Sequence, residues 1–155
     1  QVTRLPVGTP HTTGITGHEA WISGQDEILM SIRAQGEYAP DKGNLIAVTA
    51  SGEVRRVGIP GVQVNHVGAT PDGRFFSVDD WRGSSRLLIG SNKTGKSTDI
   101  CESRTSMSQG QDTHGHPYLS PDAKWLVFNS DCSGQSQIHV ASIPDEITTD
   151  VLSDD

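Results

Sequence analysis

Short apolar runs separated by polar turns follow one another along most of this 155-residue chain. Each run is rich in β-branched and aromatic residues and is bounded by Gly, Pro, Asn, Asp or Ser, which is typical of strands. No stretch shows the 3.6-residue apolar period of an amphipathic helix. The pattern therefore predicts an all-β protein. The clearest runs are EILMSI at 27–32, NLIAVT at 44–49, RFFSVDD at 74–80, RLLIG at 86–90, KWLVFNS at 124–130 and QIHVASI at 137–143.

The runs belong to a repeat that begins with a histidine. HEAWISGQDEILMSI starts at His18, HVGATPDGRFFSVDD at His66 and HPYLSPDAKWLVFNSD at His116, so the starts are 48 and 50 residues apart. A second pair of expected strands follows in each unit, within 44–59, 86–100 and 137–151. Four strands at this period are typical of a β-propeller blade.

The repeat predicts one β-propeller domain with about three four-stranded antiparallel blades, a partial propeller. We expect the blades at approximately 18–65, 66–113 and 114–155, and we expect residues 1–17 to be the end of a preceding blade. Three blades alone would leave two apolar faces uncovered. The chain begins at Gln1 rather than Met. We therefore expect further blades, either from a missing N-terminal part or from another chain.

Composition removes some classes of function. The net charge is −7, from 12 basic and 19 acidic residues, which gives no basic footprint for a nucleic acid. No apolar run approaches the roughly 20 residues needed to span a membrane, and no signal peptide is visible. The two cysteines, Cys101 and Cys132, do not have the spacing of a metal site.

The segment GSNKTGKS at 90–97 matches the phosphate-binding P-loop pattern in full. That loop needs a strand before it and a helix after it, whose N-terminus faces the phosphates. A strand precedes the segment, but the following residues lack an apolar helical stripe. In the repeat, the segment occupies the turn between the third and fourth strands of a unit. The sequence therefore favours a β-hairpin over a nucleotide site.

A second motif, QDTHGHPYLSPD at 111–122, carries two histidines at positions i and i+2. On an extended strand this spacing puts both imidazoles on one face, where they could share a metal ion. Taken alone, such a pair is more often two polar residues on a solvated face. The repeat changes this balance, because the first strand of each blade lines the central channel of a propeller. We therefore expect His66, His114 and His116 to converge near the axis and to serve a metal or catalytic function.

Three segments together resemble the C-terminal blades of the oligogalacturonate lyase family: TGHEAW at 16–21, NHVGATPDG at 65–73 and QDTHGHPYLSPDAKWLVFNSD at 111–131. Members of that family are seven-bladed propellers of more than twice this length. The resemblance implies a metal-dependent polysaccharide lyase that cleaves oligogalacturonate, a pectin fragment, by β-elimination to 4,5-unsaturated uronates. It also implies a cytoplasmic location, while a periplasmic or secreted one stays open. About four blades, with the arginines that handle substrate, would be missing, so we expect the isolated chain to be inactive.

The resemblance also implies roles for particular residues. The metal ligands would be His66 from one blade and Gln111, His114 and His116 from the next. Three imidazoles and an amide oxygen suit a mid-row divalent ion and leave Zn²⁺, Fe²⁺, Ni²⁺ and Mn²⁺ open. The resemblance points to Mn²⁺. His18 matches the position of the family's proposed Brønsted base, and its alternative is a structural histidine at a blade start.

Two other functions remain compatible with the sequence. One is a non-enzymatic propeller module that binds a partner across its channel face. The other is a propeller lyase that acts on another uronate polysaccharide. Metal analysis separates the first from an enzyme, because a scaffold does not need stoichiometric metal.

Overall fold

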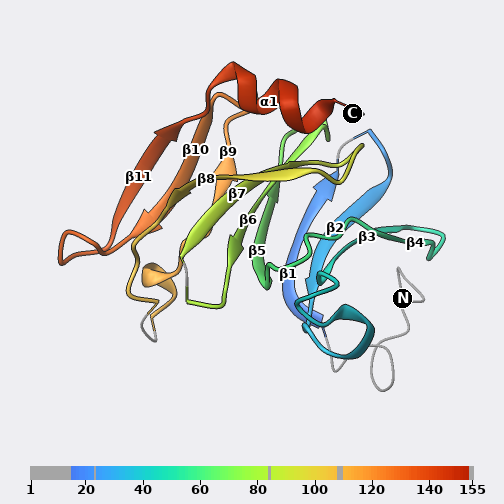
Figure 1. Ribbon diagram of the computed structural model, residues 1–155, viewed down its shortest axis with the longest axis horizontal. Coiled ribbons are helices and arrows are strands. Elements are labelled where there is room, and N and C mark those ends of the chain that lie inside the picture. Colours follow the sequence, from blue (N-terminus) through green and yellow to red (C-terminus); the bar gives the residue numbers. More distant parts are fainter. Residues whose placement is uncertain (1–14, 23, 84, 108–109, 154–155) are drawn as a thin grey trace.

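The chain folds into three antiparallel β-sheets that follow one another in sequence order (Figure 1). This computed structural model describes residues 15–22, 24–83, 85–107 and 110–153. Residues 1–14, which belong to the segment expected to end a preceding blade, lie outside the described part of the chain. The three sheets confirm the β-propeller blades predicted from the repeat.

The first sheet has the strand order β1-β2-β3-β4 and the second has the order β5-β6-β7-β8. Both are simple antiparallel meanders, as expected from short strands joined by tight turns. The strands of the first sheet are β1 (Ile15–Ile22), β2 (Glu27–Ile32), β3 (Leu45–Thr49) and β4 (Val54–Arg56). Those of the second are β5 (Val64–Ala69), β6 (Phe75–Asp80), β7 (Arg86–Ser91) and β8 (Ser97–Glu102).

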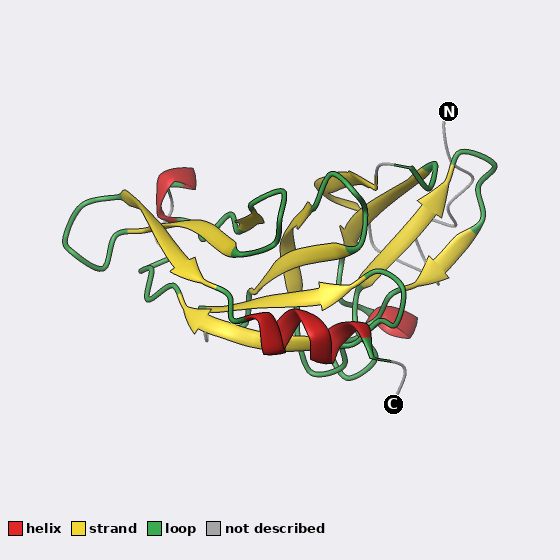
Figure 2. Cartoon of the chain, turned by 90° about the horizontal axis from the view of Figure 1, so that it is seen from above, coloured by secondary structure: helices red, strands yellow, loops and turns green. Residues whose placement is uncertain are grey.

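The third sheet has three strands rather than four. Its order is β11-β10-β9, with β9 at Tyr118–Leu119, β10 at Trp125–Ser130 and β11 at Gln137–Ser142. The segment expected to form the fourth strand is instead the helix α1, Asp145–Leu152, which crosses toward the second sheet (Figure 2). A strand prediction for this segment was therefore wrong.

The local sequence explains why α1 is helical. Pro144 precedes the helix, and Asp145 and Glu146 occupy its first turn, where negative charge is favourable beside the helix dipole. Val151 is 1% exposed, and Ile147, one turn earlier, packs against the same core. A single i, i+4 pair is a weak helical signal, so the helix is easily overlooked in a sequence dominated by strands.

Two cores join the sheets. One lies between the first and second sheets and includes Leu29, Leu45, Phe76 and Val78. The other lies between the second and third sheets and includes Phe75, Leu87, Leu126 and Phe128, with α1 packed against it. Side chains of a strand alternate between faces, so adjacent residues such as Phe75 and Phe76 enter different cores.

The P-loop-like segment is a β-hairpin, as the repeat predicts. Strand β7 pairs with β8 in antiparallel register, and Gly90 lies opposite Ser97. The Ser91 amide donates to the Lys96 carbonyl, and the Gly95 amide donates to the Ser91 carbonyl. A strand rather than a helix follows the turn, so the segment lacks the helix N-terminus that a phosphate site requires.

Candidate functional site

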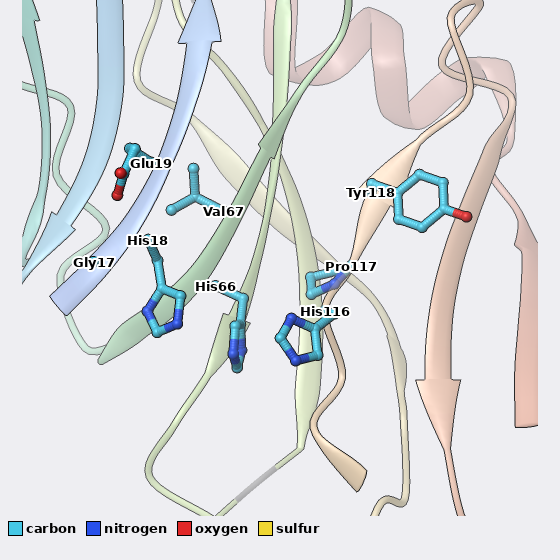
Figure 3. A pocket seen from close by; sticks show the side chains of 8 residues that line it. All are labelled: Gly17, His18, Glu19, His66, Val67, His116, Pro117 and Tyr118. Carbon is cyan, nitrogen blue, oxygen red and sulfur yellow. The ribbon is translucent and has the colours of Figure 1, made fainter. Parts of the chain in front are cut away.

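Three histidines from the starts of three successive sheets lie side by side (Figure 3). His18 comes from β1, His66 from β5, and His116 from the segment just before β9. The ring centroids of His18 and His66 are 4.5 Å apart, and those of His66 and His116 are 3.9 Å apart. They border a cleft of about 340 Å³ that is lined by Gly17, His18, Glu19, His66, Val67, His116, Pro117 and Tyr118.

A fourth histidine completes a group suited to a metal ion. One ring nitrogen from each of His66, His114 and His116 lies within 4.8 Å of the other two. Ligand atoms about 2.1 Å from a shared ion lie about 3.0–4.2 Å apart, so the three rings would have to draw closer together to bind one ion. The Nδ1 atom of His114 is buried and has no hydrogen-bond partner among the described residues, as expected for an atom available to a cation.

His66 is held more firmly than the other ligand candidates. It is 3% exposed, and its ring nitrogen Nδ1 lies 2.5 Å from Oδ2 of Asp79 on the neighbouring strand β6. The other carboxylate oxygen of Asp79 accepts the backbone N–H of His66 at 2.8 Å. Trp81 makes T-shaped contacts with the rings of both His66 and His114, with centroid distances of 5.6 and 4.9 Å.

Gly68 lets the second and third sheets approach closely beside the cleft. A Cβ atom at this position would lie 2.9 Å from Oγ of Ser77 and 3.1 Å from the carbonyl oxygen of Pro117. The Ser77 hydroxyl donates to that same carbonyl at 2.9 Å. These contacts fix the backbone immediately after His116 and so bring its ring toward His66.

His116 has an unusual backbone conformation, with φ of +41°. Histidine is among the few residues other than glycine that adopt this left-handed region with some frequency. Burial lowers the pKa of the His116 ring more than the nearby backbone of Gln111 raises it.

Burial keeps two of these imidazoles neutral at neutral pH. Loss of solvent lowers the pKa of His18 below its usual 6.5, and the nearby ring of His66 lowers it further. The pKa of His116 is lowered for the same reason, first by burial and then by the neighbouring His66 and His114. A neutral imidazole is the form that accepts a proton or binds a cation.

Two predicted roles remain, those of Gln111 as a metal ligand and of His18 as the base. Gln111 begins a short 3₁₀ helix, Gln111–Thr113, and is exposed. Its backbone contacts His116, while ligation by its side-chain amide stays a prediction. His18 borders the cleft but stands outside the group of three that could share an ion. Its Nδ1 atom is buried and has no hydrogen-bond partner among the described residues.

Three residues near the site were not anticipated from the sequence: Asn65, Asp79 and Trp81. The Nδ2 atom of Asn65 is 3.5 Å from Nε2 of His66, and the Asn65 side chain partly offsets the lowering of the His18 pKa by burial. A signal for Asp79 was present, since the hairpin that turns at Asp72 and Gly73 pairs residues equally distant from the turn. Counted one residue beyond the pair Val67 and Val78, the same register brings Asp79 next to His66, where the strand pairing becomes irregular.

The fold and the cluster together define a segment of a β-propeller with a histidine-rich, metal-competent cleft. No known family profile matches the chain. Two curated proteins match part of its sequence: the oligogalacturonate lyase of Dickeya dadantii (34% identical) and the oligogalacturonide lyase of Pectobacterium atrosepticum (35% identical). Each match extends over 65 residues, which are 39% of this chain and 17% of the relative.

Solved structures agree on the fold. An oligogalacturonate lyase in complex with manganese aligns with a TM-score of 0.66 and 21% identity, over 84% of this chain and 35% of that chain. The β-propeller domain of the Trilobed protease from Pyrococcus furiosus aligns with a TM-score of 0.53 and 13% identity, over 81% of this chain and 38% of that domain. The chain thus spans well under half the length of the proteins it matches. These matches confirm the resemblance to oligogalacturonate lyases that the sequence indicated.

Proposed function

We propose that this chain is the metal-binding and proton-abstracting part of a lyase that cleaves oligogalacturonate by β-elimination. The observation that carries the proposal is the convergence of His18, His66, His114 and His116 at one cleft, from the starts of three sheets. A propeller scaffold needs no histidine at these positions. The similarity to oligogalacturonate lyases supplies the substrate class.

The ligand set in this proposal is His66, His114 and His116, with Gln111 as the fourth protein ligand. Imidazole-rich donors suit a mid-row divalent ion, and Mn²⁺ is our choice because a structurally similar lyase was solved with manganese. When bound, such an ion would act as a Lewis acid that stabilises negative charge on the uronate carboxylate. The buried, unpartnered Nδ1 of His114 is consistent with this donor set.

His18 would act as the base. The proton at C5 of galacturonate lies α to the carboxylate and is the one removed in a β-elimination. A ring nitrogen of His18 takes this proton, the electron pair forms the C4–C5 double bond, and the C4–O4 bond breaks. The departing oxygen receives a proton from water. The lowered pKa of His18 keeps its ring neutral, and so able to accept a proton, from mildly acidic pH upward.

The cleft must exclude part of the solvent and hold the sugar against His18. Val67 and Pro117 supply an apolar surface beside the histidines, and Tyr118, 54% exposed, stands at the rim. The chain's own residues therefore provide the base and one wall of the cleft.

Further blades are also part of the proposal. The outward face of the third sheet exposes Trp125, Ile138 and Val140 by 49%, 71% and 58%. Trp125 occupies the repeat position of Phe75, which is 2% exposed because the third sheet covers it. We propose that another blade covers Trp125 in the same way, and that the substrate arginines lie on such blades. The cytoplasmic location implied by the resemblance is likewise a proposal.

The test uses the complete lyase with oligogalacturonate as substrate and the absorbance of the unsaturated product as readout. His18→Ala should lower turnover by about 10² to 10⁴-fold, the usual effect of losing a positioned base, with unchanged Mn²⁺ content. His114→Ala should remove the metal as well as the activity. His139→Ala is the matched control, because His139 stacks on Phe128 in another part of the third sheet. Full activity in His18→Ala, or a wild-type protein with no stoichiometric metal, would contradict the proposal.

A further inference from the structure

The carboxylate of Asp79 contacts His66 at two points. Oδ1 accepts the backbone N–H of His66 at 2.8 Å, and Oδ2 lies 2.5 Å from the ring nitrogen Nδ1. Both side chains are almost completely buried, with exposed fractions of 4% for His66 and 5% for Asp79. Water therefore cannot substitute for either partner, and the direction of each hydrogen bond is set by the protein.

This contact determines which nitrogen of His66 carries the proton. An ionised carboxylate can only accept hydrogen bonds, so Nδ1 must be the protonated nitrogen. Nε2 then presents its lone pair, and the Nδ2 donor of Asn65 lies 3.5 Å from it. A metal ion needs the same lone pair that this arrangement exposes.

The repeat indicates that the fold does not require a carboxylate here. The three hairpins have equivalent registers, with Ala20 opposite Leu29, Gly68 opposite Ser77 and Tyr118 opposite Val127. The position of Asp79 is therefore occupied by Ser31 in the first sheet and by Asn129 in the third. Only the sheet that contributes the buried His66 carries an acidic residue at this position.

We propose that Asp79 is a positioning residue that holds His66 in the Nδ1–H tautomer, so that Nε2 is its metal-binding atom. The inference rests on the proposed function, since it concerns the same metal site. Carboxylates that hold the distal nitrogen of a metal-bound imidazole orient the ring and strengthen the ligand. Trp81 packs against the same ring, with centroids 5.6 Å apart and the ring planes at 68°.

Asp79→Asn is the informative variant. Its side chain has one acceptor and one donor, so it cannot accept both the backbone N–H and the Nδ1–H of His66. If the amide oxygen keeps the backbone N–H, the amide nitrogen faces Nδ1 and favours the Nε2–H tautomer. We expect Mn²⁺ affinity to fall about 10- to 100-fold, as for loss of other partners of metal-bound histidines. The measurement is a calorimetric titration with Mn²⁺ alone.

The control is Asp80→Asn. Asp80 is 2% exposed and pairs with Arg86 at 2.8 Å, so its replacement removes a buried charge one residue away without touching the His66 ring. We expect lower stability but unchanged Mn²⁺ affinity. An equal loss of affinity in the two variants would overturn the positioning role and assign the effect to general destabilisation.

A second measurement does not depend on any variant folding. Nitrogen-15 NMR of the metal-free wild-type protein distinguishes the two tautomers of His66 by the shifts of its ring nitrogens. We expect Nδ1 to be protonated, and an Nε2–H tautomer would overturn the inference. A protein with the expected tautomer that binds no divalent ion would refute the proposed function alone. Unchanged Mn²⁺ affinity in Asp79→Asn would refute the positioning role and leave the function intact.

Discussion

Replacing Gly68 by alanine tests whether the close approach of β5 and β9 is what holds the metal site together. The new methyl group would meet Ser77 Oγ at 2.9 Å, the Pro117 carbonyl oxygen at 3.1 Å and Cα of Tyr118 at 3.3 Å. Two of these three neighbours are backbone atoms that cannot rotate away. β9 must therefore move outward by roughly 0.3–0.5 Å for the contacts to reach ordinary van der Waals distances.

Two opposing terms set the size of the effect. Overpacking of this kind typically costs about 1–3 kcal/mol. Alanine is less flexible than glycine in the unfolded chain, which stabilises the folded state by about 0.4–1 kcal/mol. We expect a net loss of about 1–2 kcal/mol in the free energy of unfolding, measured by urea denaturation. Because His116 moves with β9, Mn²⁺ affinity should also fall about tenfold, since functional groups tolerate misplacement of only about 0.5 Å.

A double-mutant cycle identifies the responsible atom. Ser77→Ala alone should cost about 0.5–1.5 kcal/mol, through loss of the hydrogen bond to Pro117. In Gly68→Ala/Ser77→Ala the nearest clashing atom is gone, so the double variant should lose less than the sum of the single losses. Strict additivity, or unchanged stability and Mn²⁺ affinity in Gly68→Ala, would refute the argument that this contact sets the position of His116.

Three further outcomes follow from the same structure. His116→Ala should abolish stoichiometric Mn²⁺ binding measured by metal analysis, and retained full occupancy would remove this residue from the ligand set. Leu126→Ala should lower the free energy of unfolding by about 2–5 kcal/mol in urea denaturation, because Leu126 is 0% exposed between the second and third sheets. The metal-free protein should lose stability as pH falls below about 6.5, since His18 and His116 have lowered pKa values in the folded state and take up protons more readily when unfolded. A urea midpoint that stays constant from pH 7.5 to roughly 5 would contradict this, and His18→Gln should flatten the dependence.

The sequence was sufficient for the sheets and for the meeting of the histidines, because both follow from the period of the repeat. Because His18, His66 and His116 lie in or just before the first strands of three successive sheets, the propeller architecture brings them to one region. The same reasoning identified GSNKTGKS as a hairpin turn, since the repeat assigns that place to a turn.

Features that depend on side-chain contacts between strands were harder to predict. The left-handed backbone conformation of His116 could not be predicted from the repeat, because the equivalent histidines His18 and His66 do not adopt it. The helix α1 was missed because an eight-residue helix presents only a few apolar residues to the core, here Ile147, Val151 and Leu152. Asn65 and Trp81 flank histidines in ways that only the three-dimensional arrangement reveals.

The substitution of α1 for a fourth strand has a consequence for the behaviour of the chain on its own. β11 is left as the edge of its sheet, with a row of backbone donors and acceptors that no strand of the described chain pairs. Natural edge strands are usually protected from joining other chains by lysine, proline or a bulge. The β11 sequence QIHVAS contains neither residue, and β10 and β11 pair in continuous register. We expect this edge to recruit strands from other molecules, so self-association of the isolated chain would begin at β11, and a lysine at Val140 would suppress it.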